Sequence, residues 1–236
     1  MPRKTRVIFP GYPHHVVQRG HNKQAVFRDD DDRKYYLELL TQYMEQSHCT
    51  LMAYCLMPNH VHLMLRPEYR ESLIECLHGV GFRYAKYFNY TSGRSGALWE
   101  DRYYASVVYE DGYMWRVAQY ICLNPVRAKI VDEPCKYHWS SAEALLRGIR
   151  NGVPVEEWID ESQRRMFEEV MLDQAEVQNI GGLLKRNIPY ASTIGMIELE
   201  NGSGEKLAPN RRGRPKIRDG GEFRVKNIPR PCLFEK

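Results

Sequence analysis

Two histidines separated by a single residue form a potential metal-binding pair. His60 and His62 lie in MPNHVHLML (57–65), a segment that predicts a β-strand. Side chains two residues apart in a strand point to the same face, so the two imidazoles lie side by side. They can form half of a divalent-metal site; the alternative is a polar strand face whose histidines are hydrogen-bonded or solvated. The neighbours His14 and His15 face opposite ways in a strand, cannot chelate together, and are interpreted as structural.

A tyrosine and an asparagine four residues apart form a second candidate pair. Tyr120 and Asn124 lie in QYICLNPVRA (119–128) and share one face of a predicted helix. A tyrosine hydroxyl can attack phosphorus, and an amide oxygen can bind a hard metal ion. This face can therefore place a nucleophile beside a metal held by the two histidines. The alternative is a packed tyrosine, one of sixteen in the chain, followed by an asparagine that ends a helix before Pro125.

Cations interleaved with aromatic residues suggest a nucleic-acid surface. Lysine and arginine can hold phosphates, while aromatic rings can stack on unpaired bases. The alternative for each cation is a solvated charge above an ordinary aromatic core. The candidate DNA contacts in the body of the chain are Arg19, Lys23, Arg83, Arg102 and Arg127.

The carboxyl-terminal segment is basic, although the net charge of the whole chain is only +4. From Glu205 onward ten lysines and arginines oppose four acidic residues, which suggests a polyanion partner. Within this segment RRGRPK (211–216) resembles a short hook that lies in the minor groove of A·T-rich DNA. Its candidate contacts are Arg211, Arg212 and Arg214; nonspecific phosphate binding is the alternative.

The pattern of elements that must position these residues predicts an α+β fold. Strand, helix, strand, strand, helix, strand is the order of a ferredoxin-like split βαβ unit, an antiparallel sheet with helices on one face. Apolar periodicity and turn signals place these elements at 14–19, from Asp29 or Asp30 onward, at 50–57, at 60–66 after a turn at 58–59, from Ser72 onward, and within 98–108.

Further helices are predicted after this unit: from Asp111 to about Leu123 or, alternatively, past Pro125; after the cap-like Trp139-Ser140-Ser141; and over 156–178 as one charged amphipathic helix. We therefore expect a catalytic domain over 1–150, a helical extension over 151–200, and a basic, flexible DNA-contacting tail over 201–236.

The composition excludes several other classes of protein. Hydrophobic residues make up 43% and charged residues 27% of the chain, as in an ordinary soluble globular protein. No apolar run approaches the roughly 20 residues of a membrane-spanning helix. The amino terminus lacks the apolar core of a signal peptide, so we expect no membrane association and a cytoplasmic location. The six cysteines are scattered without a C-x-x-C pair, which argues against a zinc site or a disulfide framework.

Several segments occur together in an order that resembles a known family, the REP-associated tyrosine transposases, which are relatives of the single-tyrosine transposases of small bacterial insertion sequences. The resemblance covers residues 11–145 and extends more loosely over 198–216. The HVH and Y-x-x-x-N-P-V-R-A motifs are specific when they occur together. The segments are GYPHHVVQRGHNKQAVF (11–27), MPNHVHLML (57–65), GRSGALWEDRYYASVV (93–108), YICLNPVRAKIV (120–131) and YHWSSAEAL (137–145).

The resemblance implies an HUH-type nuclease fold and a set of site residues. By similarity, His60 and His62 match the HUH metal ligands, Tyr120 matches the nucleophile, and Asn124 falls where relatives place a third ligand. The metal implied is Mg²⁺ or Mn²⁺. The implied activity is cleavage and rejoining of single-stranded DNA beside REP-type hairpins through a 5′-phosphotyrosine, in a bacterial, nucleoid-associated monomer or homodimer.

Three other functions are compatible with the residues alone. The first is a catalytically silent hairpin binder or repressor, against which the intact His60, His62 and Tyr120 argue. The second is an RNA-binding module, since split βαβ sheets also stack RNA bases; such a module leaves the histidine pair unexplained. The third is a metal-dependent hydrolase without a covalent step, which would retain activity in a Tyr120→Phe variant.

Overall fold

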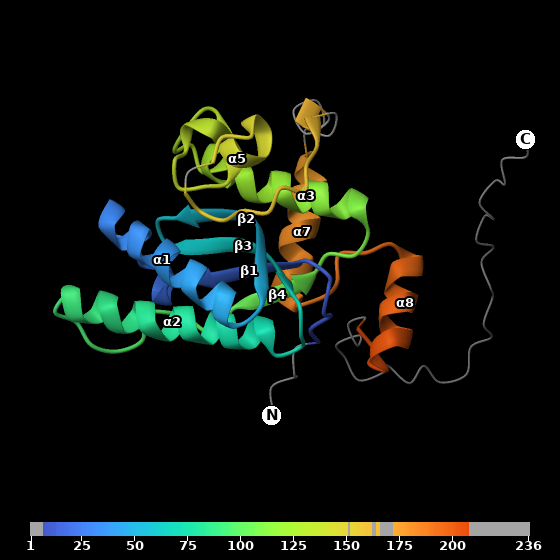
Figure 1. Cartoon of the computed structure of the whole chain (residues 1–236), viewed down its shortest axis with the longest axis horizontal. Helices are drawn as coiled ribbons and strands as arrows, with labels where there is room; N and C mark the ends of the chain where they lie inside the picture. Colours follow the sequence, from blue (N-terminus) through green and yellow to red (C-terminus); the bar gives the residue numbers. More distant parts are fainter. Residues whose placement is uncertain (1–6, 151, 162–163, 166–171, 208–236) are drawn as a thin grey trace, which may run out of the picture.

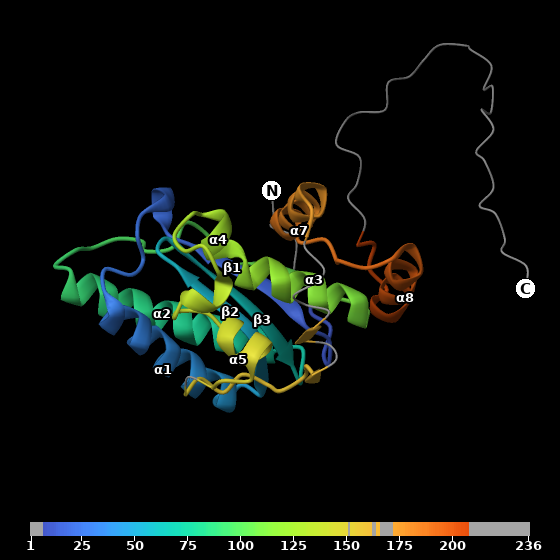
Figure 2. The ribbon, with the colours of Figure 1, turned by 90° about the horizontal axis from the view of Figure 1, so that it is seen from above.

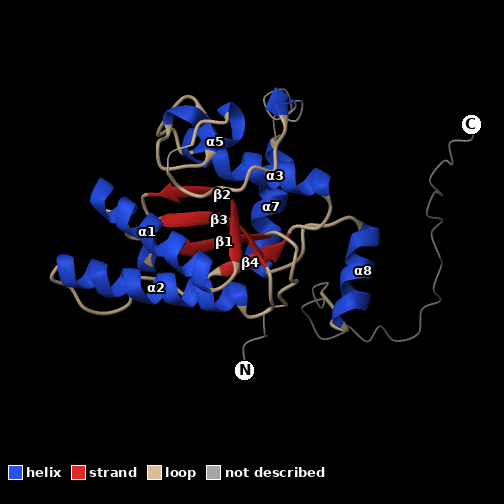
Figure 3. Cartoon of the chain, viewed as in Figure 1, coloured by secondary structure: helices blue, strands red, loops and turns tan. Residues whose placement is uncertain are grey.

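The computed structural model describes residues 7–150, 152–161, 164–165 and 172–207. A four-stranded antiparallel sheet in the order β2-β3-β1-β4 forms the centre of the protein (Figures 1 and 3). β2 and β3 form a hairpin through the predicted turn at 58–59. The element order confirms the predicted α+β fold of ferredoxin-like topology. The strands are β1 His14–Arg19, β2 Cys49–Met57, β3 His60–Pro67 and β4 Tyr104–Val107.

Two long helices, α1 Asp30–Gln46 and α2 Ser72–Thr91, pack together on one face of the sheet. The carboxylate of Asp29 caps α1 by accepting a hydrogen bond from the backbone N–H of Asp32 at 2.9 Å. The apolar stripes of both helices bury Tyr36 and Tyr84 against the odd-numbered side chains of β3. This layer is the main core, and Figure 1 shows α1 and α2 together below the sheet.

The opposite face of the sheet is covered by the elements that follow β4. They are α3 Asp111–Cys122, α4 Asn124–Arg127, the 3₁₀ turn η2 Pro134–Lys136 and α5 Ala142–Arg147. Figure 2 shows α3, α4 and α5 lying across the strands. A second core forms here from Met52, Met57 and Met64 of the sheet and Val117 and Ile121 of α3. The even-numbered side chains of β3, including both candidate histidines, therefore face α3.

The two edges of the sheet are covered by the chain's own later segments. On the β4 side, Asn187 Oδ1 accepts a hydrogen bond from the backbone N–H of Ala105, and the N–H of Tyr190 donates to Val107 O. On the β2 side, Val155 pairs with Leu51 in a parallel bridge. Covered edges protect a sheet from pairing with other chains.

The predicted helix over 156–178 is wrong in part. Residues 156–160 are not helical, because the N–H of Glu156 donates to Leu51 O and Trp158 Nε1 donates to Met52 O, which holds the chain along β2. A separate helix, α7 Gln174–Arg186, begins where the Asp173 carboxylate accepts a hydrogen bond from Glu176 N–H. Residues 162–163 and 166–171 lie outside the described part of the chain.

The remaining described elements are η1 His21–Lys23 after β1 and α8 Thr193–Ser203, which lies away from the sheet in Figure 1. Since α8 ends at Ser203, the first residues of the expected irregular tail are helical. Within the residues that the structure describes, no helix is long and apolar enough to cross a bilayer. The expected tail contacts Arg211, Arg212 and Arg214 lie outside those residues.

Candidate active site

His60 and His62 lie on the face of β3 that packs against α3, as the strand periodicity predicts. Their ring centroids are 4.9 Å apart. His62 is buried, whereas His60, at the start of the strand, is partly exposed. The neighbouring strand places Val17 opposite His62 and Arg19 opposite His60. The pair therefore lies at one end of the sheet, with His60 nearer to solvent.

Each of the two histidines has a polar partner on its Nδ1 atom. His60 Nδ1 is 2.6 Å from Asn59 Oδ1, and His62 Nδ1 is 3.0 Å from His15 Nε2. An amide oxygen can only accept, so His60 carries its proton on Nδ1 and keeps a lone pair on Nε2. An imidazole held in this way is the usual form of a metal ligand.

Burial keeps both imidazoles neutral, the state that metal binding requires. Desolvation lowers the pKa of His60 to about 4, with a further contribution from the positive charge of Arg19. Desolvation also lowers the pKa of His62 well below its usual value, and the charges of His60, His15, Arg127 and Arg19 act in the same direction. A cation would be accepted here without first displacing protons near neutral pH.

Tyr120 lies on α3 with its ring beside the histidines. The ring centroid is 5.7 Å from that of His62 and 5.5 Å from that of His15, both in edge-to-face arrangements. Burial raises the pKa of the Tyr120 hydroxyl, whereas the positive charges of Arg127 and Arg19 lower it. The phenol is thus held next to the histidine pair, and burial keeps its pKa above the usual value although the two cations act in the opposite direction.

Asn124 begins α4, one turn after Tyr120. Its Nδ2 donates to Tyr120 O at 2.9 Å and contacts Ile121 O at 3.4 Å, so the amide nitrogen is directed at backbone carbonyls. α3 ends at Cys122, close to the expected end at about Leu123, but Asn124 does not terminate a helix before Pro125, because it is the first residue of α4. With its nitrogen engaged, Asn124 offers only Oδ1 to a metal ion.

The donor types of His60, His62 and Asn124, two neutral imidazoles and an amide oxygen, would suit a divalent ion. Among the described residues, no three or more histidine, cysteine, aspartate and glutamate side chains gather in a group suited to a metal. A purely acidic or thiolate metal centre is therefore not found in that part of the chain. Two neutral imidazoles with an oxygen ligand suit ions of intermediate hardness, such as Mn²⁺, and do not exclude Mg²⁺.

Two of the candidate DNA-binding arginines flank this group. Arg127 is exposed, with its guanidinium carbon 4.4 Å from the centre of the Tyr120 ring, and it donates a hydrogen bond to Tyr120 O. Arg19 Nε is buried and has no hydrogen-bond partner among the described residues. An unpaired buried guanidinium donor beside two neutral histidines is suited to an anion such as a phosphate.

The other three body cations lie outside the histidine–tyrosine cluster, although the backbone carbonyl of Lys23 accepts a hydrogen bond from Asn59 Nδ2, next to His60. Lys23 in η1, Arg83 in α2 and Arg102 before β4 are all exposed. Arg102 lines a groove of about 620 Å³ between α2 and the loop before β4, together with the apolar side chains of Phe82 and Trp99. Since α2 packs on the sheet face opposite α3, Arg83 is not part of the histidine cluster.

Sequence reasoning missed His15. The two neighbouring histidines do face opposite ways, as predicted, and His14 bonds to the backbone near Tyr12. His15, however, faces α3 and contacts both His62 and Tyr120. The available signal was its position in a strand that could pair with the H-x-H strand, but the register of that pairing is needed to predict the contact.

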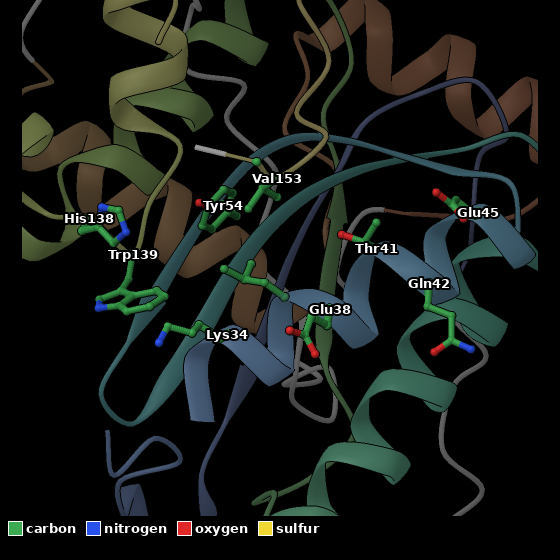
Figure 4. A pocket seen from close by; sticks show the side chains of 11 residues that line it. Lys34, Glu38, Thr41, Gln42, Glu45, Tyr54, His138, Trp139 and Val153 are labelled. Atoms are coloured by element: carbon green, nitrogen blue, oxygen red, sulfur yellow. The ribbon is translucent and has the colours of Figure 1, made fainter. Parts of the chain in front are cut away.

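A separate pocket of about 670 Å³ lies between α1 and the segment around residues 138–153 (Figure 4). Figure 4 shows Lys34, Glu38 and Glu45 of α1 along its wall, with Trp139 across from them. None of the candidate site residues lines it. The pocket mixes charges of both signs and does not gather groups suited to chemistry.

Comparison with known proteins decides the family. Residues 10–124 match the IS200-like transposases, a span that contains both histidines, Tyr120 and Asn124. The segment over residues 10–124 belongs to the IS200-like transposase family. No curated protein shows significant similarity to this chain.

Several solved structures are similar to this chain, among them the following two. One is a REP-associated tyrosine transposase bound to a REP hairpin, with a TM-score of 0.50 and 16% identity over 69% of this chain and 96% of that chain. The other is a protein from Deinococcus radiodurans R1 named as a transposase, with a TM-score of 0.34 and 20% identity over 55% of this chain and 92% of that chain. At this identity the first likeness supports the fold alone.

Proposed function

We propose that this transposase cleaves and rejoins single-stranded DNA through a covalent bond to Tyr120, with a divalent metal held by His60, His62 and Asn124. The observation that carries the proposal is the edge-to-face contact of the Tyr120 ring with His62, at 5.7 Å between centroids. This contact brings together the nucleophile and the metal ligands expected from the sequence. Membership of the IS200-like family supports the same assignment.

In the proposed reaction the Tyr120 oxygen attacks the scissile phosphorus as its proton is lost to solvent. The bond from phosphorus to the 3′-oxygen breaks, and the 3′-oxygen takes up a proton from solvent, which leaves a 5′-phosphotyrosine and a free 3′-hydroxyl. Because one phosphoester replaces another, a second 3′-hydroxyl can reverse the step and join strands without a nucleotide cofactor. Mg²⁺ or Mn²⁺, when bound, supplies Lewis-acid polarisation of the phosphate.

Arg19 and Arg127 would hold the scissile phosphate and favour the ionised tyrosine. Burial alone disfavours a tyrosinate, so the nucleophile needs nearby positive charge. Both arginines act on the Tyr120 pKa in that direction. The unpaired Nε of Arg19 is suited to donate to a phosphate oxygen.

The proposed substrate is single-stranded DNA next to a REP-type hairpin. A protein of similar fold is bound to a REP hairpin, and the exposed Lys23, Arg83 and Arg102 suit phosphate contacts outside the cleavage site. In this scheme residues 1–150 form the catalytic domain, 151–200 a helical extension, and 201–236 a DNA-contacting tail that includes Arg211, Arg212 and Arg214.

The test is to incubate the protein with a labelled single-stranded hairpin oligonucleotide and Mg²⁺ or Mn²⁺, and to resolve the products on a denaturing gel. We expect a metal-dependent, SDS-resistant protein–DNA adduct that is absent from Tyr120→Phe and from the His60→Ala/His62→Ala double variant. Chelation by EDTA should abolish the adduct. Hairpin binding without an adduct in either metal would favour a silent hairpin binder, and cleavage by Tyr120→Phe would identify a different nucleophile.

A further inference from the structure

His15 lies beside the candidate metal ligand His62 in the interior of the protein. It is 1% exposed, its Nε2 is 3.0 Å from His62 Nδ1, and the two rings are within 23° of parallel. In the β1–β3 register His15 is opposite Met64, so it reaches His62 along the diagonal of the antiparallel pair. This contact comes from the sheet geometry, since the two histidines are 47 positions apart in the sequence.

The position of the shared proton decides whether His62 can bind a metal. A neutral imidazole carries one proton, and the nitrogen that binds the ion must keep its lone pair. Because Nδ1 of His62 faces His15, only its Nε2 is available as a ligand. The proton of His62 must then be on Nδ1, and His15 Nε2 must accept it. The opposite arrangement would place a proton on His62 Nε2 and block the site.

The same arrangement is found at the other ligand. His60 Nδ1 lies 2.6 Å from Asn59 Oδ1, which is able only to accept, so Nε2 of His60 is free. Asn59 and His15 thus occupy equivalent places behind the two ligands. Asn59 is next to His60 in the chain, whereas His15 comes from a different strand.

We propose that His15 is a positioning residue of the metal site: its Nε2 accepts the Nδ1 proton of His62 and so presents His62 Nε2 to the metal. The inference rests on the proposed function, because it assumes that His62 is a ligand. The His15 ring also lies edge to face against the ring of Tyr120, with 5.5 Å between the centroids, so His15 fixes the spacing between ligand and nucleophile. Groups in this position commonly change metal affinity by about 10- to 100-fold.

The first test uses the metal-free protein and observes the tautomer directly. Two-bond ¹H–¹⁵N spectra of ¹⁵N-histidine-labelled protein, assigned with His62→Gln and His15→Phe, should show wild-type His62 protonated on Nδ1 and unprotonated on Nε2. In His15→Phe, which fills the space without an acceptor, we expect the proton of His62 to move to Nε2 or divide between both nitrogens. A wild-type His62 protonated on Nε2 would overturn the proposal.

The second test measures Mn²⁺ binding by calorimetry. We expect the affinity to fall about 10- to 100-fold in His15→Phe and to recover in part in His15→Gln, whose amide oxygen can accept the proton. His14→Gln is the matched control, because His14 is equally buried but bonds to Tyr12 O and Phe9 N–H instead. Wild-type affinity in a folded His15→Phe variant would contradict the proposal.

The two tests separate this inference from the proposed function. If adduct formation in His15→Phe is restored by excess Mn²⁺, His15 acts on metal binding and leaves the chemistry of Tyr120 intact. A wild-type protein that binds no Mn²⁺ would refute the metal site itself, whereas the tautomer spectrum would still report whether His15 sets the proton of His62.

Discussion

The guanidinium of Arg127 lies over the ring of Tyr120, with its central carbon 4.4 Å from the ring centre. The same side chain donates a hydrogen bond to the backbone carbonyl of Tyr120, seven residues earlier in the chain. Leu123, the one residue between α3 and α4, keeps a right-handed helical backbone, so Arg127 follows Tyr120 by about two helical turns. A cation held on the ring and open to solvent can act on both the phenol and an incoming phosphate.

Removal of this cation should slow cleavage more than it weakens hairpin binding. In Arg127→Met we expect the rate of adduct formation to fall about 100-fold, the usual effect of losing one preorganised transition-state donor. Arg127→Lys should recover only part of the rate, because an ammonium cannot stack on the ring and donate as a planar guanidinium does. The measurement is single-turnover adduct formation at saturating Mn²⁺.

Lys129→Asn is the matched control for Arg127. Lys129 is an exposed cation two residues away with a φ of 57°, a conformation that asparagine tolerates. Lys129→Asn lowers the net charge by the same amount as Arg127→Met. It should leave the rate of adduct formation within about twofold of wild type, the ordinary effect of an exposed surface charge. Equal rates for Arg127→Met and wild type would remove Arg127 from the reaction.

Two atoms of Asn124 have separable effects. The proposed ligand Oδ1 affects metal binding, and the hydrogen-bonded Nδ2 affects stability. Asn124→Leu should weaken Mn²⁺ binding by about 10-fold or more, since it removes the amide oxygen proposed as ligand. Asn124→Asp should retain the affinity but lower the free energy of unfolding by about 1 kcal/mol, because a carboxylate cannot donate to Tyr120 O. Calorimetry and urea denaturation measure the two effects, and unchanged Mn²⁺ affinity in Asn124→Leu would exclude Asn124 as a ligand.

Much of this fold could be predicted from the sequence, because local signals determine it. The strand over His14–Arg19 was predicted with the bounds that the structure has, and α1 begins at its predicted aspartate cap. The predicted single helix over 156–178 was wrong for residues 156–160, because its apolar pattern continues across a change of structure. Tertiary bonds from Leu51 and Met52 hold the start of that segment against β2 instead.

The candidate site was predictable only in part. Strand alternation places His60 and His62 together, and helical spacing places Tyr120 one turn before Asn124. Neither signal predicts that the tyrosine approaches the histidines, since that depends on how α3 crosses the sheet. The role of His15 depends on a diagonal contact between strands, and a shift of register by one residue would turn it to the other face.

Burial of His14 should make the protein less stable in acid. Desolvation lowers the pKa of His14 to about 4 in the folded protein, against 6.5 for an unperturbed histidine. The unfolded chain therefore binds more protons between pH 4 and 6.5, and the free energy of unfolding falls as the pH is lowered through that window. The difference between these two pKa values corresponds to a loss of about 3 kcal/mol for this group.

His14→Gln should reduce this dependence on pH. Glutamine does not titrate, so the difference in unfolding free energy between wild type and variant should shrink from pH 7 to pH 4 by about 3 kcal/mol. Urea denaturation followed by circular dichroism over that pH range measures the effect. Parallel stability curves would show that His14 accepts a proton as readily when folded as when unfolded.

Gly181 of α7 lies next to the Tyr120 hydroxyl, so substitutions there test whether the helical extension affects the nucleophile. A Cβ at this position would lie 3.5 Å from the Tyr120 hydroxyl oxygen, which is ordinary contact. Gly181→Ala should therefore leave adduct formation nearly unchanged, whereas the larger side chain in Gly181→Leu must displace the hydroxyl or block its approach to phosphate. Because displacement of a reacting group by about 1 Å can cost 100-fold, we expect a loss of about that size in Gly181→Leu.

The neighbouring glycine provides the control. A Cβ at Gly182 meets only the flexible end of Arg186, at 3.8 Å, so Gly182→Leu makes the same chemical change on the same helix without contacting Tyr120. Both leucine variants should stabilise α7 by a similar amount, about 1 kcal/mol, because glycine is a poor helix former. Only Gly181→Leu should slow adduct formation, with Mn²⁺ affinity unchanged in both. Equal rates in the two variants would mean that α7 does not limit access to the nucleophile.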